Sequence, residues 1–254
     1  MTTPSGVMET IDYREVLYST YVSGHKKHTH ERVSEGDKNR FLDYLEWCYG
    51  DWLVPPSGNP KVLDLGCGSG LILSLFERLG YRDIHGVDLS EEQVLIARER
   101  FPDVALANMF DYLKEQDENS FDLVTGFDLV EHLTRPEMIH FFREVLRVLK
   151  PGGRMIIQMP NGDSPFAGAV QCSDPTHESL YTSTAYRHIL FASGFDVLGF
   201  KERKPRPVGL KGYVRAFLWE CLRGGIKAAH YIETGAPSTN IYSRVFACCA
   251  VKPS

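Results

Sequence analysis

The chain has 254 residues, 43% of them hydrophobic, which is enough apolar material to bury the core of one domain with insertions. Its formal net charge of −5 argues against a general nucleic-acid binder, because such domains are usually basic. No apolar run is long enough to cross a bilayer and residues 1–24 are too polar for a signal peptide, so we expect a cytoplasmic protein without a transmembrane segment.

The cysteines have no paired Cys-x-x-Cys spacing of the kind that zinc sites use. They stand at positions 48, 67, 172, 221, 248 and 249. We therefore expect reduced thiols, with Cys67 inside a turn and with Cys248 and Cys249 filling the core.

Residues 1–60 are predicted to be a helical N-terminal region with an apolar stripe. The stripe consists of Phe41, Leu42, Leu45, Trp47 and Cys48. Three histidines and two lysines between Tyr21 and His30 indicate either a solvated arm or a flap over a ligand.

A glycine-rich turn follows, after a Pro- and Gly-rich break at residues 55–60. Residues 61–65 are typical of a buried strand and residues 71–79 have helical apolar spacing. Between them, Gly66, Gly68 and Gly70 would let a ligand approach bare backbone N–H groups. A dinucleotide fingerprint would need its third glycine at position 71, where this chain has leucine, so the dehydrogenase interpretation is disfavoured.

The predicted second strand, residues 84–88, ends in Asp88, about twenty residues after the glycines. A carboxylate there can accept hydrogen bonds from both hydroxyls of a ribose, whereas helix capping is the alternative role. Ser90 and Gln93 are predicted to form a capping box for a helix that runs to about Phe101.

Three more strands are predicted at residues 104–106, 121–126 and 155–159, the last preceded by a turn at 149–154. Pro136 suits the first turn of a helix before that turn. The apolar stripe of this helix is predicted to be Ile139, Phe142, Val145, Leu146 and Leu149.

The segments LDLGCGSG, GVDLS, FDLV…EHL and LKPGG, in this order, resemble the class I SAM (S-adenosylmethionine)-dependent methyltransferases over roughly residues 60–200 and the last strand. The resemblance implies a doubly wound, Rossmann-like α/β fold: a seven-stranded, mostly parallel sheet with an antiparallel last strand at 241–251. It divides the chain into an N-terminal cap (1–60), a SAM-binding core (61–200), a basic insertion or lid (201–237) and the last strand (238–254).

The same resemblance implies SAM as cofactor and a set of cofactor-binding residues. These are Asp64, Gly66, Cys67, Gly68, Gly70, Asp88, Leu89, Gln93, Asn108, Met109, Phe110 and Phe127.

Methyl transfer to an alcohol needs a group that takes up or weakens the O–H bond. Glu131 and His132 follow the fourth strand at the rim of the glycine turn, and His177 lies in a polar loop, so these three are the catalytic candidates, with a solvated loop histidine as the alternative for His177. Asp163 and Asp174 are weaker candidates.

Asp128-x-x-Glu131-His132 is similar to the Glu-x-x-Glu-His set that binds metal in ubiquinone-pathway and small-RNA 2′-O-methyltransferases. The resemblance implies a divalent metal, with His177 as the fourth ligand, and the donors would suit Mn²⁺, Fe²⁺ or Zn²⁺. This chain departs from the pattern in having the shorter Asp128; metal-free histidines, or acids that only cap the following helix, are the alternatives.

The pattern from Pro160-Asn161 through residues 174–178 to Tyr181-Thr182 also looks like methyltransferases of bacterial polysaccharide and glycolipid pathways. It implies O-methylation of a sugar hydroxyl. A quinone or other small-molecule O- or N-methyltransferase is the alternative enzyme, and a non-catalytic SAM-binding regulatory protein is the alternative of another class.

Residues 201–227 carry a basic cluster in an acidic chain. The cluster comprises Lys201, Arg203, Lys204, Arg206, Lys211, Arg215, Arg223 and Lys227, against Glu202 and Glu220. With Val214, Phe217, Leu218, Trp219 and Leu222 it predicts an amphipathic helix and an anionic or membrane-bound acceptor, such as a glycolipid, with peripheral membrane contact; an ordinary lid with a solvated face is the alternative.

Overall fold

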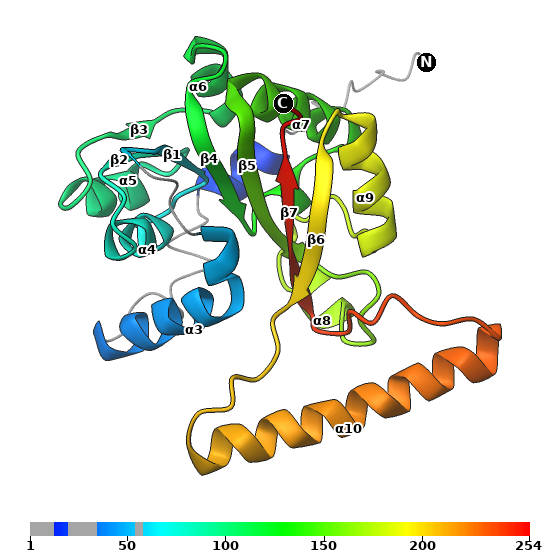
Figure 1. The fold of residues 1–254 in the computed structure, drawn as a ribbon. Helices are drawn as coiled ribbons and strands as arrows, with labels where there is room; N and C mark the ends of the chain where they lie inside the picture. The colour runs from blue at the N-terminus through cyan, green and yellow to red at the C-terminus, as the bar shows by residue number, and fades with distance from the viewer. Residues whose placement is uncertain (1–12, 20–34, 54–57) are drawn as a thin grey trace, which may run out of the picture.

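The computed structural model describes residues 13–19, 35–53 and 58–254 (Figure 1). The histidine cluster between residues 21 and 30 lies outside the described residues. Within the described part of the chain, no helix is both long and apolar enough to span a membrane.

Within these residues, the strands form one seven-stranded sheet in the order β3-β2-β1-β4-β5-β7-β6. β7 runs antiparallel to both of its neighbours, and the other pairs are parallel. The predicted fold class is therefore confirmed. The bounds are β1 (Lys61–Leu65), β2 (Asp83–Asp88), β3 (Val104–Leu106), β4 (Phe121–Phe127), β5 (Leu149–Pro160), β6 (Asp196–Glu202) and β7 (Val245–Val251).

Helices cover both faces of the sheet (Figure 1). They are α1 (Tyr13–Ser19), α3 (Glu35–Leu53), α4 (Leu71–Arg78), α5 (Glu91–Arg98), α6 (Met109–Glu115), the 3-10 helix η2 (Val130–His132), α7 (Arg135–Val148), α8 (Gly168–Gln171), α9 (Ser183–Ala192) and α10 (Gly209–Thr234).

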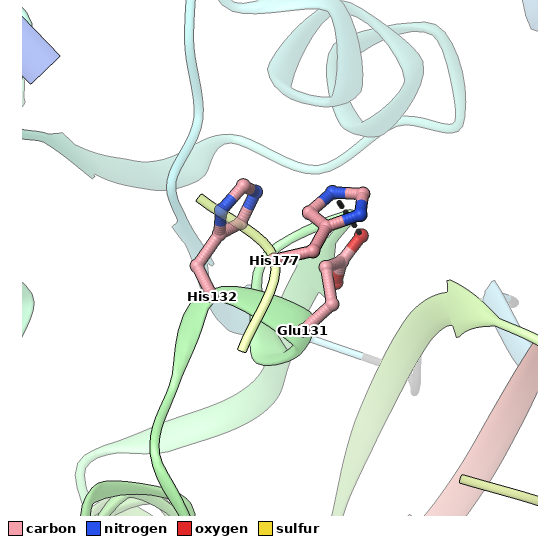
Figure 2. Close-up of side chains that lie close together, drawn as sticks. All are labelled: Glu131, His132 and His177. Atoms are coloured by element: carbon pink, nitrogen blue, oxygen red, sulfur yellow. Dashed lines mark ion pairs between the residues drawn. The ribbon is translucent and has the colours of Figure 1, made fainter. Parts of the chain in front are cut away.

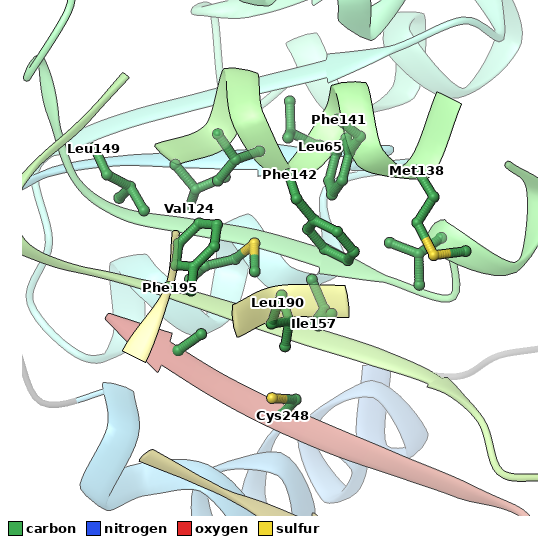
Figure 3. Close-up of a cluster of buried hydrophobic side chains, with 14 of the residues drawn as sticks. Leu65, Val124, Met138, Phe141, Phe142, Leu149, Ile157, Leu190, Phe195 and Cys248 are labelled. Atoms are coloured by element: carbon green, nitrogen blue, oxygen red, sulfur yellow. The ribbon is translucent and has the colours of Figure 1, made fainter. Parts of the chain in front are cut away.

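Alternating residues of each strand supply the two cores. Val124 and Ile157 pack with α7 and α9 on one face (Figure 3). Their neighbours Leu123 and Ile156 pack with α3, α4 and α5 on the other face. Strands buried on both faces explain why the sequence has continuous apolar runs.

The cysteines are free thiols, and Cys248 and Cys249 are buried on opposite faces of the sheet. Cys67 is also buried, whereas Cys172 and Cys221 are exposed. The prediction that these three buried thiols fill the turn and the core is confirmed.

Helix α7 begins with a capping box, in which the side chains of Thr134 and Glu137 each accept a hydrogen bond from the other residue's backbone N–H. Pro136 stands in the first turn of the helix. Its buried face is Met138, Phe141, Phe142, Val145 and Val148. The predicted stripe was rotated relative to this face, because Ile139 and Leu146 are only partly buried.

Two local predictions were wrong in detail. Ser90 caps α5 in position, but its side chain makes no capping hydrogen bond, and α5 ends at Arg98. On α3, the buried face is Leu42, Leu45, Tyr49, Trp52 and Leu53, whereas Trp47 is exposed.

The expected turn at 149–154 is part of β5. Its pairing with β4 jumps from Leu149 opposite Phe121 to Arg154 opposite Leu123, so the extra residues form a bulge that includes Gly152 at φ 76°. At the other end of the sheet, β7 begins at Val245, four residues later than the expected start at Ile241.

Candidate active site

A cavity of about 580 Å³ lies where β1, β2, β3 and β4 end. This is the usual position for a ligand in a doubly wound sheet, because the turns after parallel strands meet at one edge. Residues that follow these strands line one part of the cavity, and η2 and the loop after α8 line another.

The glycine turn is tied to the end of β2. The N–H groups of Gly66 and Cys67 donate to the carbonyl oxygen of Val87, at 2.9 and 3.1 Å, and Gly68 N–H donates to Asp88 Oδ2 at 2.8 Å. The expectation of bare N–H groups was therefore wrong, since all three have partners within the protein. The missing Cβ atoms still matter, because Gly66 and Gly68 line the cavity.

Asp88 occupies the tip of β2 and lines the cavity. Its second oxygen, Oδ1, accepts from Ser90 N–H at 2.8 Å. The carboxylate is thus held in a fixed orientation, and each oxygen keeps acceptor capacity for a ribose hydroxyl.

Nine of the predicted cofactor residues line the cavity: Gly66, Gly68, Asp88, Leu89, Gln93, Asn108, Met109, Phe110 and Phe127. Gln93 Oε1 is buried there without a hydrogen-bond partner among the described residues, as a group awaiting a ligand would be. Asn108 Oδ1 accepts from Phe110 N–H at 2.9 Å, so this side chain also caps α6.

Asp64, Cys67 and Gly70 are not among the described residues that line the cavity. Asp64 is buried and accepts a 2.6 Å hydrogen bond from the Thr125 hydroxyl. Burial raises the pKa of Asp64 to about 7, against the opposing effect of that hydrogen bond. Gly70 has φ 85°, and a Cβ there would lie 3.1 Å from the Phe101 ring. Asp64 therefore ties β1 to β4, whereas Cys67 and Gly70 belong to the turn itself.

The three catalytic candidates converge at the other part of the cavity. Glu131 and His132 belong to η2, and His177 comes from the loop after α8 (Figure 2). One ligand atom from each lies within 4.8 Å of the others. The N–H groups of Glu178 and Ser179 donate to the Glu131 carbonyl oxygen, at 2.8 and 3.1 Å, and this holds the loop against η2.

Electrostatics make this group unusual. Burial, reinforced by the Asp128 carboxylate, raises the pKa of Glu131 well above its ordinary value. Glu131 Oε2 and His177 Nδ1 are buried with no hydrogen-bond partner among the described residues, and Glu131 Oε1 lies 4.0 Å from His177 Nε2. Unpaired buried polar atoms are costly, so this donor set fits a divalent cation.

His132 is oriented by the loop that carries His177. Its Nδ1 lies 2.8 Å from the Thr176 hydroxyl oxygen, and that hydroxyl donates to Asp174 Oδ1 at 2.6 Å. Because the hydroxyl has one proton, it accepts from Nδ1–H, which places the lone pair of the neutral ring on Nε2. Asp174 therefore acts on His132 through Thr176.

Asp128 does not belong to the three-residue group. It has φ 52°, and Gln158 Nε2 donates to its Oδ1 at 3.0 Å, while its own N–H donates to the Gln158 carbonyl oxygen. The predicted four-residue set is therefore reduced to three. The expectation that these acids cap the next helix was also wrong, because Thr134 and Glu137 cap α7. Asp163 accepts from Ser183 at the start of α9.

Arg14 of α1 was not predicted to be near the site. It pairs with Glu137 at 2.8 Å and with Glu178 at 3.3 Å, and it donates to the His132 carbonyl oxygen at 3.3 Å. The hydrogen bond from Arg14 lowers the pKa of Glu137 to about 2. No local pattern marks Arg14, because these partners at the site lie more than a hundred residues away in the chain. Leu129, Leu133 and Ser173, which also line the cavity, were likewise missed.

A family model described as a methyltransferase domain matches residues 30–199, which include the glycine turn and the candidate site. The chain belongs to this family. The predicted methyltransferase class is confirmed at this level.

Among curated methyltransferases, a ubiquinone/menaquinone biosynthesis C-methyltransferase of Roseobacter denitrificans is 34% identical over 122 residues, 44% of this chain and 48% of that protein. A ubiquinone biosynthesis O-methyltransferase of Maricaulis maris is 34% identical over 109 residues, 41% of this chain and 42% of that protein. The chain spans about half the length of the curated relatives it matches.

Solved methyltransferases share the fold. A SAM-dependent methyltransferase from Archaeoglobus fulgidus has a TM-score of 0.65 at 20% identity, covering 92% of this chain and 99% of that one. Phosphoethanolamine N-methyltransferase 2 of Haemonchus contortus, solved with SAM, has a TM-score of 0.63 at 22% identity, covering 97% of this chain and 61% of that one.

Proposed function

We propose that the protein is an O-methyltransferase that transfers the methyl group of SAM to a hydroxyl of an acceptor bound beside Glu131, His132 and His177. The observation that carries this proposal is the juxtaposition of one buried carboxylate and two imidazoles in the cavity that the cofactor residues line. Such a group has no evident role in holding SAM. It suits the deprotonation of an alcohol, whose pKa is far above neutrality.

SAM supplies an electrophilic methyl carbon on its sulfonium sulfur. In the proposed step the acceptor oxygen forms a bond to this carbon as the carbon–sulfur bond breaks, leaving S-adenosylhomocysteine. His132 Nε2 or His177 takes the hydroxyl proton. Asp88 and the glycine turn contribute by orientation, since they fix the cofactor relative to the acceptor.

Glu131, His132 and His177 would hold a divalent metal, and such an ion would supply a Lewis acid that lowers the pKa of a bound hydroxyl. One carboxylate and two imidazoles favour Mn²⁺, Fe²⁺ or Zn²⁺ over Mg²⁺. The Thr176 hydroxyl would then hold the His132 ring in place through Nδ1, the nitrogen that does not bind the metal, as partners of metal-bound histidines do.

For the acceptor, we propose a sugar hydroxyl of a glycan or glycolipid. Support comes from the polar lining of this part of the cavity, which includes Ser173, Asp174 and Glu137, because an aromatic acceptor favours an apolar enclosure. The second candidate is a quinone precursor with a free hydroxyl, which the ubiquinone biosynthesis O-methyltransferases among the relatives favour.

The test is release of S-adenosylhomocysteine with panels of sugar and phenolic acceptors, together with mass spectrometry of glycans, lipids and quinones from cells with and without the gene. Loss of one methyl group identifies the acceptor class. SAM binding with no turnover on any acceptor, and no methyl difference in cells, would favour the non-catalytic alternative.

The metal is tested separately by treating the protein with a strong chelator. We expect turnover to be lost with SAM binding intact, and to be restored by Mn²⁺ in the parent protein but not in His177→Ala. The matched control is His188→Ala, which removes an exposed histidine of α9. Full turnover after verified metal removal would assign the histidines to metal-free proton transfer.

A further inference from the structure

None of the 26 residues of α10 is buried, yet the helix has one covered side. Six residues are partly covered, at spacings of four and three: Gly212, Ala216, Trp219, Arg223, Ile226 and His230. This spacing places them along one stripe of the helix. Arg223 anchors that stripe, because it contacts Glu202 of β6 at 3.4 Å and donates to the Asn240 carbonyl oxygen at 3.1 Å.

The opposite side of α10 is apolar and faces outward. Its side chains include Leu210, Val214, Phe217, Leu218 and Ile232, and the exposed fractions of Leu210, Phe217 and Ile232 are 83%, 69% and 83%. An ordinary surface helix turns its large apolar side chains toward the core, whereas α10 also exposes several of them on the side away from the core. An apolar side on a helix that stands apart from the sheet needs an external partner (Figure 1).

The positive charge of the segment that contains α10 favours an anionic partner. Residues 201–234 contain eight Lys and Arg residues and three Glu, a net charge of +5 in a chain whose net charge is −5. Lys211 and Arg215 lie along one border of the apolar side and Lys227 along the other, and all three are exposed. Long basic side chains at such borders can reach outward to anionic groups while their stems cover apolar surface.

We propose that the outward side of α10 docks on an anionic lipid bilayer, with the helix lying flat in the interface. A wide apolar side bordered by Lys and Arg is the pattern of interfacial helices. A second copy of α10 would bring two basic segments together, which disfavours self-association through this face. The helix is too polar to cross the bilayer.

Docking would place the cavity on the membrane side of the molecule. α10 follows the end of β6, at the edge of the sheet where the parallel strands end (Figure 1). The cavity lies at the same edge. An acceptor carried by the bilayer would then be delivered at this edge. The docking itself rests on α10 alone and does not depend on the proposed methyl acceptor.

The experiment is co-sedimentation of the full chain with vesicles of phosphatidylcholine and phosphatidylglycerol, against vesicles of phosphatidylcholine alone. We expect binding to the mixed vesicles, weakened by salt. Phe217→Ser with Leu218→Ser should lower the vesicle partition coefficient at least about tenfold, because two buried apolar side chains are lost from the interface. Lys211→Glu with Arg215→Glu should lower it on anionic vesicles only.

The matched control is Phe191→Ser, which removes a side chain that is 74% exposed on α9. It should leave vesicle binding unchanged, and SAM binding should be equal in all variants, as a check of folding. The proposal is overturned if the parent protein does not bind anionic vesicles, or if Phe191→Ser weakens binding as much as the α10 variants. It is also overturned if the α10 variants leave vesicle binding intact while converting a dimer to a monomer, since that result assigns α10 to self-association.

Discussion

The Thr176 hydroxyl oxygen lies 2.8 Å from Nδ1 of His132 and fixes which nitrogen of that ring carries the proton. The hydroxyl donates its own proton to Asp174, so it can only accept from the ring. The arrangement is a chain from a buried carboxylate through a hydroxyl to an imidazole. Thr176 is therefore a positioning residue for His132.

We predict that Thr176→Val lowers kcat by about ten- to a hundredfold, the usual cost of losing the partner of a functional histidine. SAM affinity should change little, because Thr176 does not line the cavity. Thr176→Ser should recover most of the loss, since it restores the hydroxyl. A full rate in Thr176→Val, with an unchanged pH profile, would show that the tautomer of His132 is set elsewhere.

Replacing Asp88 by Ala should weaken SAM binding by about 1–3 kcal/mol, because it removes the predicted acceptor for two ribose hydroxyls. Part of the loss will come from the protein itself, since Asp88 also accepts from the N–H groups of Gly68 and Ser90. Calorimetry measures the affinity. Asp83→Ala, at the opposite end of β2, is the control, and equal affinities in the two folded variants would contradict the assignment of Asp88.

Gly68→Val should lower the affinity for SAM more than Asp88→Ala does, because the valine side chain would occupy the cavity. The backbone of Gly68 also has φ 54°, which disfavours any residue with a Cβ. Gly80→Val separates strain from obstruction. Gly80 has φ 93° with no atom within 4 Å of an added Cβ, so only the conformational cost, about 1–2 kcal/mol of stability, applies there. We expect both variants to lose a similar amount of stability and only Gly68→Val to lose SAM binding. If a folded Gly68→Val protein still binds SAM, the ligand lies elsewhere.

Much of the fold was predictable because the apolar pattern within each segment indicates whether it forms a strand or a helix. The apolar runs predicted β1, β2 and β4, and the distance from the glycines to Asp88 predicted the edge of the sheet at which the cavity lies. The buried face of α7 was predicted wrongly, because a sequence pattern assigns an apolar residue such as Ile139 to the core whether or not the sheet covers it.

The site was only partly predictable, since tertiary contacts decide it. Glu131, His132 and His177 could be predicted, because carboxylate and imidazole side chains are recognisable in a sequence as candidates for proton transfer or metal binding. The exclusion of Asp128 depends on its left-handed backbone and its bond to Gln158, thirty residues away, and neither leaves a local pattern. Arg14 joins the site from a helix whose sequence has no signal beyond a basic residue.

Asp64→Asn should stabilise the protein at neutral and alkaline pH. The unfolded carboxyl releases its proton near its ordinary pKa of 3.8, whereas burial holds the folded pKa near 7. Between these values the folded state binds the extra proton, so stability falls as pH rises and levels off above about pH 7. The variant keeps the acceptor for Thr125 without this penalty. Its advantage in thermal unfolding should grow from near zero at pH 4 to at most about 4 kcal/mol at pH 8; a constant difference across this range would contradict the prediction.

Arg14→Met should loosen α1 from the site and reduce the pH dependence of stability in acid. The folded pKa of Glu137 is depressed to about 2, first by the hydrogen bond from Arg14, so its stabilising contribution is present above its ordinary pKa of 4.5 and is lost as pH falls from there toward 2. Because both side chains are partly exposed, we expect a loss of about 1 kcal/mol at pH 7, smaller than the pKa alone suggests.

Thermal unfolding from pH 7 to pH 3 measures this effect. The difference between the parent protein and Arg14→Met should shrink as pH falls, since protonation of Glu137 removes the same interaction. Arg40→Met is the matched control, because Arg40 pairs with Asp37 three residues away on the exposed side of α3, where such pairs contribute little. If the two variants lose the same stability with the same pH dependence, Arg14 is an ordinary surface residue. A loss confined to Arg14→Met, accompanied by faster proteolysis within residues 13–19, would establish that this arginine fastens α1 over the loop that carries His177.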